Sequence, residues 1–136
     1  MTVEATGEIY YDPYDRAIDA GSTQLNMAEA ATLVDTLDLH LFRSAGLIDD
    51  AAASGVYPSS LDRAKVRMDT GYIARKAREA IDVLLSVQGA GSFAQVSALQ
   101  RMWRDSETAS RHAVVNPSIA AEAYGREILG VGSQIT

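Results

Sequence analysis

Apolar and small residues recur every three or four positions through most of the chain, which is the period of an amphipathic helix. The first series forms one face of a helix about 30 residues long, roughly 45 Å at 1.5 Å per residue, which ends before Gly55 and Pro58. Its members are Met27, Ala30, Val34, Leu37, Leu41, Ser44, Ile48 and Ala51. The second series lies between Ser59 and a break at residues 88–92: Val66, Thr70, Ile73, Ala77, Ala80, Leu84 and Val87. The pattern predicts two long helices joined by a short turn.

Two shorter helices are predicted in the rest of the chain. The third covers roughly residues 95–114, and the fourth begins at Asn116-Pro117 and ends at Gly130. Asparagine is a good helix cap, and proline suits the first helical position because the N–H that it lacks would have no partner there. Ser59, with Asp62 three positions later, is a variant of the capping box that starts the second helix. Together these elements predict an all-α fold, an antiparallel four-helix bundle over residues 24–130.

The two ends of the chain lack this period. Residues 1–23 include Tyr10, Tyr11 and Tyr14 and are interpreted as an irregular N-terminal arm whose tyrosines pack against another surface. Residues 131–136 are expected to form a loose tail.

Composition narrows the class of protein. Hydrophobic residues make up 47% of the chain and charged residues 22%, as in globular proteins. No apolar run reaches the ~18 residues that a membrane span requires, and the first residues lack the basic and apolar parts of a signal peptide. The absence of cysteine excludes disulfides and thiol chemistry and fits a cytoplasmic location. A net charge of −6 argues against a nucleic-acid partner.

The third predicted helix carries the polar residues that chemistry would need, on one face: Arg101, Asp105, Thr108 and His112. A guanidinium can hold a phosphate or carboxylate with two hydrogen bonds, and an imidazole can exchange a proton near neutral pH. The same spacing also allows a purely structural interpretation, in which Arg101 pairs with Asp105, Glu107 pairs with Arg111, and the helix end stabilises His112. Spacing alone leaves both interpretations open. No metal site is predicted, because His40 has no HxxE or HxxxH partner.

The segment from Leu99 to Gly130 resembles the C-terminal signature of the acyl-CoA dehydrogenase superfamily, in its branch of two-component, reduced-flavin-dependent monooxygenases. Its landmarks are Leu99-Gln100-Arg101, Trp103-Arg104-Asp105, Arg111-His112, Asn116-Pro117, Tyr124-Gly125 and Leu129-Gly130. A weaker likeness extends back to about residue 25. Within it, Gln88-Gly89 matches a glycine-bearing turn that lies close to the cofactor in superfamily members.

The resemblance implies a flavin-dependent oxidoreductase that uses reduced FMN or FAD and O2 to hydroxylate an aromatic or similar small molecule. It implies that His112 lies near the flavin and the substrate, where it can hydrogen-bond or deprotonate a phenol. It also makes Arg101, Arg104, Gln88 and Gly89 candidates for contacts with the cofactor.

The chain also departs from the family, whose members carry an N-terminal helical domain and a middle β-domain ahead of this bundle. We therefore expect a fragment, one half of a split enzyme or a stand-alone bundle, which by itself binds flavin weakly or not at all. The expected partner is a second copy of the chain or another chain that supplies the missing domains. The alternatives are an acyl-CoA dehydrogenase-type domain, a flavin-free bundle for oligomerisation or partner binding, and a cofactor-independent isomerase or cyclase.

Overall fold

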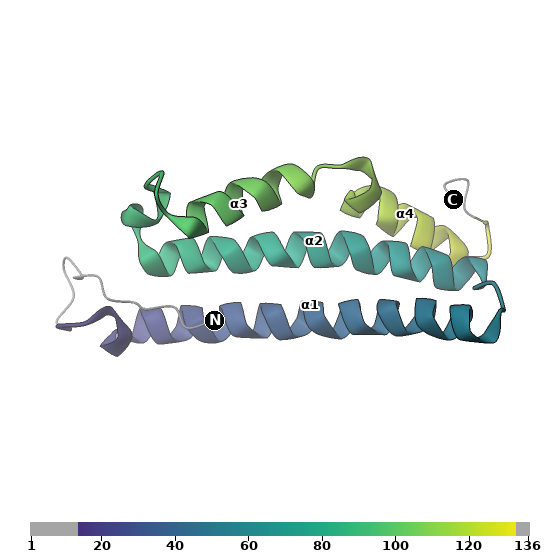
Figure 1. Cartoon of the computed structure of the whole chain (residues 1–136), viewed down its shortest axis with the longest axis horizontal. Coiled ribbons are helices and arrows are strands. Elements are labelled where there is room, and N and C mark those ends of the chain that lie inside the picture. Colours follow the sequence, from purple (N-terminus) through teal and green to yellow (C-terminus); the bar gives the residue numbers. More distant parts are fainter. Residues whose placement is uncertain (1–13, 133–136) are drawn as a thin grey trace.

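Four α-helices and three short 3-10 segments make up the part of the chain that is described, residues 14–132 of a computed structural model (Figure 1). In chain order they are η1 (Ala17–Asp19), α1 (Gly21–Ser54), α2 (Ser60–Gln88), η2 (Ala90–Phe93), α3 (Ala98–Ala109), η3 (Ala113–Val115) and α4 (Pro117–Ile128). Residues 14–132 contain no β-strand. The predicted all-α class with four helices is confirmed.

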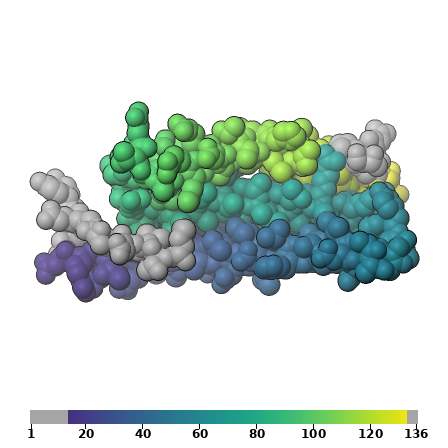
Figure 2. Space-filling view, viewed as in Figure 1, coloured from purple at the N-terminus to yellow at the C-terminus, as the bar shows by residue number. Residues whose placement is uncertain are grey.

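The helices form three layers with α2 in the middle. Helix α1 runs antiparallel to α2 along one face, while α3 and α4 follow one another end to end along the opposite face (Figure 1). Helix α1 contacts α2 and η1 but neither α3 nor α4. Figure 2 shows the atoms of α1 and α2 meeting along the part of their boundary that is visible in this view. This arrangement is more open than four helices around one shared core, and it leaves one side of α1 without a neighbour among the described residues.

The capping residues act as the sequence indicates. Ser59 Oγ accepts a hydrogen bond from Asp62 N at 3.1 Å and donates one to Asp62 Oδ2 at 2.6 Å. Asn116 Oδ1 accepts from Ser118 N at 3.0 Å at the start of α4. Gly55 ends α1 with φ of 68°, in the left-handed region that favours glycine. These three predictions are confirmed.

The first helix begins at Gly21, a few residues before the predicted boundary at 24. Segment η1 precedes it, inside the region that was expected to be irregular, and both Ala17 and Ala20 are buried. This segment contacts α1, and periodicity over so few residues does not reveal it. The remainder of the predicted arm, residues 1–13, and residues 133–136 of the predicted tail lie outside the described residues.

Helix α4 lies directly on the backbone of α2, because the residues between them are small. A Cβ atom on Gly71 would come within 3.1 Å of Pro117 Cα and 3.2 Å of Ala120 Cβ. Ala120 and Ala123 of α4 are fully buried. Glycine at position 71 therefore sets the place on α2 where α4 begins.

Candidate functional site

Arg101 and Arg104 share a hollow at the start of α3. Ser97 caps this helix by accepting a hydrogen bond from Gln100 N at 3.4 Å. Gln95, Gln100 and the two arginines line a space of about 410 Å³. Neither guanidinium makes an ion pair or a side-chain hydrogen bond with any residue from 14 to 132. Two unpaired guanidiniums beside two amides form a donor set that fits a phosphate or carboxylate.

Gln88 and Gly89 lie at the end of α2 and do not line this hollow. Gly89 has φ of 70°, and its N–H donates to Leu85 O at 2.9 Å, so it ends the helix and turns the chain into η2. Ser92, which is buried, donates to the same carbonyl at 3.4 Å. The structure thus gives the glycine a conformational role, and the cofactor contact of Gln88 and Gly89 stays a prediction.

Of the two ion pairs that the purely structural interpretation of α3 predicts, one is present and the other is absent. Arg101 and Asp105 make no ion pair. Glu107 does pair with Arg111, and it also forms an ion pair with Arg78 of α2, with 3.5 Å between Nη1 and Oε2. Arg101 is therefore free for another partner, whereas Arg111 is not.

His112 does not lie on α3, and the prediction that it extends the polar face of that helix is wrong. The helix ends at Ala109, and His112 has extended backbone angles (φ −65°, ψ 140°) as the capping residue of η3. The chain must leave helical geometry somewhere before α4, because Asn116, the residue before Pro117, has extended backbone angles and Pro117 lies against Gly71 of α2. The exposed ring uses Nδ1 to accept a hydrogen bond from Val114 N at 3.3 Å.

A buried carboxylate between α1 and α2 forms a polar cluster that the sequence analysis missed. Asp69 is 2% exposed. It accepts hydrogen bonds from Ser44 Oγ at 2.6 Å, from His40 Nδ1 at 2.8 Å, and from Arg43 through Nε at 3.2 Å and through Nη2. The ring of His40 packs on Tyr72, with centroids 4.4 Å apart. The cluster ties three residues of α1 to one acceptor on α2.

Opposing effects act on the pKa of Asp69. Burial by itself raises the pKa, because it disfavours the charged form, but hydrogen bonds from Arg43, Ser44 and His40 and the charge of Arg43 together outweigh it. The net result is a pKa below the usual value for aspartate. The carboxylate is therefore ionised at neutral pH and serves to join the helices.

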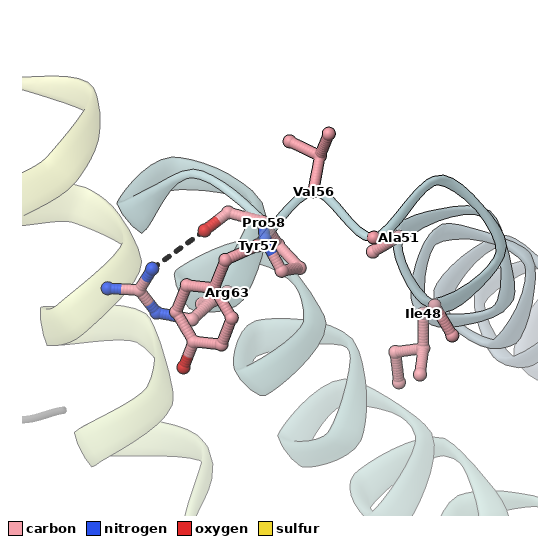
Figure 3. A pocket seen from close by; sticks show the side chains of 8 residues that line it. Ile48, Ala51, Val56, Tyr57, Pro58 and Arg63 are labelled. Atoms are coloured by element: carbon pink, nitrogen blue, oxygen red, sulfur yellow. Dashed lines mark hydrogen bonds between the residues drawn. The ribbon is translucent and has the colours of Figure 1, made fainter.

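A second hollow of about 490 Å³ lies at the turn between α1 and α2 (Figure 3). Its lining is mostly apolar: Ile48, Ala51, Ala52, Gly55, Val56, Tyr57, Pro58 and Arg63. Arg63 Nη1 donates to Pro58 O at 2.7 Å, and its guanidinium lies 5.0 Å from the centre of the Tyr57 ring. With its one cation already engaged, this hollow offers apolar surface rather than a polar ligand site.

Comparison with known proteins identifies the family. Residues 5–117 match the model of the acyl-CoA dehydrogenase C-terminal domain, which is most of the chain. The chain belongs to this family. The acyl-CoA dehydrogenase C-terminal domain formed here is also similar to part of XiaF from Streptomyces sp., solved in complex with FADH2 and glycerol. The TM-score is 0.92 and the identity 32%, over 97% of this chain and 33% of XiaF.

A curated relative supports the branch of reduced-flavin-dependent monooxygenases that the sequence resembles. The chain is 35% identical over 75 residues to the oxygenase component of p-hydroxyphenylacetate 3-hydroxylase from Acinetobacter baumannii. This match covers 55% of the chain and 18% of the relative. The chain thus spans at most a third of the length of these two proteins. No helix within residues 14–132 is both long and apolar enough to cross a membrane.

Proposed function

We propose that this chain provides the C-terminal helical domain of a reduced-flavin-dependent monooxygenase that hydroxylates an aromatic or similar small molecule. The observation that carries the proposal is the likeness to XiaF, a protein solved with FADH2, over nearly the whole chain. The likeness to the oxygenase component of a hydroxylase of an aromatic acid supports the same reaction class. The lack of cysteine fits a cytoplasmic protein.

Arg101 and Arg104 are the residues we assign to the flavin phosphates, in either FMN or FAD. Their guanidiniums have no partner within residues 14–132 and share one hollow with two amide side chains. When bound, reduced flavin supplies the electrons that activate O2. The chain's own share is to hold the phosphate and to offer His112 to the substrate. Because both arginines are exposed, we expect the chain alone to bind flavin weakly.

We further propose that the domain self-associates through one side of α1. Val34, Leu41 and Ile48 are spaced by seven residues and are 43%, 46% and 52% exposed, which is unusual for a regular apolar series on a long helix. Ile48 also lines the apolar hollow at the α1–α2 turn, so the stripe continues into that end of the molecule. A second copy of the same face would cover this surface.

The cofactor assignment is tested by anaerobic titration of the chain with reduced FMN or FAD, followed by backbone amide chemical shifts. We expect weak binding with shifts concentrated around Arg101 and Arg104, lost in the double variant Arg101→Ala/Arg104→Ala. Arg16→Ala is the matched control, because Arg16 is an exposed arginine that pairs with Asp19 in front of α1.

Three outcomes decide the matter. Saturable shifts at the two arginines support the proposal. Flavin shifts that survive in the double variant overturn the phosphate assignment. If reduced flavin produces no shifts at millimolar concentration, Arg101 and Arg104 do not form a phosphate site in this chain by themselves, and the flavin-free alternative, a bundle for oligomerisation or partner binding, is favoured.

A further inference from the structure

The turn that carries His112 is attached to α2 on both sides. Before the turn, Arg78 of α2 pairs with Glu107 in the last turns of α3 at 3.5 Å. After the turn, Pro117 lies against Gly71 at the start of α4. Helices α3 and α4 make no contact with each other, so α2 is the support for both ends of the segment.

Glu107 is the centre of the attachment on the α3 side. Its carboxylate pairs with Arg78 and with Arg111, and Arg111 Nη1 also donates to Glu107 O at 2.5 Å. The side chains of Arg78 and Glu107 are 27% and 23% exposed, so solvent screens this pair less than a typical surface ion pair. A negative charge this close to the end of a helix opposes the helix dipole, and the two guanidiniums offset that cost. The arrangement fixes Arg111, the residue directly before His112.

The hydrogen bond at His112 determines which ring nitrogen carries the proton. A backbone N–H can only donate, so Nδ1, which receives the N–H of Val114, must be an acceptor. In the neutral imidazole the proton is then on Nε2. The backbone also holds the residue, since Val115 N donates to His112 O at 3.0 Å. Nε2 makes no hydrogen bond to any residue in the range 14–132.

We propose that Glu107, anchored by Arg78, is a positioning residue that holds His112 as an Nε2–H hydrogen-bond donor. A ring held in this way donates to a substrate or cofactor oxygen and does not act as a base, because its remaining lone pair is already used. The catalytic role of His112 rests on the proposed function, whereas the hydrogen bonding of its ring can be measured without flavin.

The test is the long-range proton–nitrogen correlation spectrum of the histidine rings, recorded at alkaline pH. The chain has only two histidines, and the variant His40→Gln assigns the signals. We expect His112 of the unmodified chain to show the Nε2–H pattern. In Glu107→Ala we expect a mixture of the two neutral forms, together with a changed shift for the Val114 amide.

Asp105→Asn is the matched control, because Asp105 is an exposed carboxylate of the same helix without an ion pair. It should leave the His112 ring signals unchanged. Glu107→Gln, which keeps an acceptor and a good helix former, should give a smaller change than Glu107→Ala and serves as the test if the alanine variant does not fold.

The proposal is overturned if His112 shows the Nδ1–H pattern in the unmodified chain, or if its ring signals are identical in the Glu107 variants. These results are independent of the flavin titration. Ring signals that depend on Glu107, combined with no flavin binding, would retain the positioning role and remove the assignment of Arg101 and Arg104 to the flavin phosphates.

Discussion

Ser44 of α1 donates a 2.6 Å hydrogen bond to Asp69 of α2, and this bond lies inside the interface between the two longest helices. The carboxylate of Asp69 also accepts hydrogen bonds from Arg43 and His40, so its loss leaves several donors without an acceptor. We expect Asp69→Asn to lower the free energy of unfolding by about 1–3 kcal/mol. Chemical denaturation followed by circular dichroism measures this. Asp82→Asn, an exposed position on α2, should change stability by less than about 0.5 kcal/mol, and equal losses in both variants would refute a special role for Asp69.

The lowered pKa of Asp69 makes stability depend on pH in a defined direction. In the unfolded chain the aspartate pKa is about 3.9, and in the folded chain it lies lower. The stabilisation is therefore fully present above about pH 4 and is lost as pH falls through the folded-state pKa. Denaturation curves over a series of acidic pH values should show a smaller decrease in Asp69→Asn than in the unmodified chain. Parallel curves for the two proteins would contradict the assignment.

The close approach at Gly71 predicts opposite results for two glycine substitutions. Gly71→Ala places a methyl group 3.1 Å from Pro117 Cα, a backbone atom that cannot yield without moving α4. We expect a loss of about 1–3 kcal/mol. Gly46→Ala in α1 has no atom within 4 Å of the new Cβ, and it should gain up to about 1 kcal/mol from better helix propensity. Thermal melting of both variants measures the contrast, and a stabilised Gly71→Ala would disprove the tight α2–α4 contact.

The exposed stripe on α1 predicts self-association that one charge can prevent. Leu41→Glu puts a carboxylate in the middle of the series formed with Val34 and Ile48, so we expect a monomer because burying an unpaired charge is costly. Leu39→Glu is the control, since Leu39 is 73% exposed but lies on a different side of α1. Sedimentation velocity compares the two variants with the unmodified chain. A strictly monomeric unmodified chain at tens of micromolar would remove the proposal.

His112 is expected to affect turnover more than stability. Its ring is exposed and makes one long hydrogen bond, so His112→Asn should leave the melting temperature almost unchanged. Loss of a hydrogen-bond donor at the reacting substrate or cofactor lowers the rate by about 100-fold or more. Thermal melting and hydroxylation with reduced flavin supplied provide the two measurements. A clear fall in melting temperature with unchanged turnover of the folded fraction would assign His112 to structure.

Local signals predicted most of the fold. The starts of α2 and α4 depend on interactions within a few residues, at Ser59 for α2 and at Asn116 and Pro117 for α4. Helix α1 ends at Gly55 because of the backbone angle of that glycine. Such features need no knowledge of the rest of the chain. The end of α3 at Ala109 has no such local signal, because neither glycine nor proline occurs in the seven residues that follow it, and the predicted end of the helix is therefore too late.

The sequence contains a signal for the Asp69 cluster that hydrophobic periodicity alone does not reveal. Asp69 lies three residues after Val66 and four before Ile73, on the face that the apolar series assigns to the core. A carboxylate at such a position needs donors on the facing helix, and Ser44 was already on the core face of α1. Which residue of α1 would face it depends on the register of the two helices, which the sequence does not state.

Within residues 14–132, α2 is the only helix that contacts both outer layers, because α1 touches neither α3 nor α4. We therefore expect two cooperative units that share α2, one formed with α1 and one formed with α3 and α4. Helix α1 should be able to open away from α2 while α3 and α4 stay docked, and the reverse should also hold. Amide hydrogens of α2 should then exchange only when both units have opened, whereas those of α1, α3 and α4 should each report on a single opening.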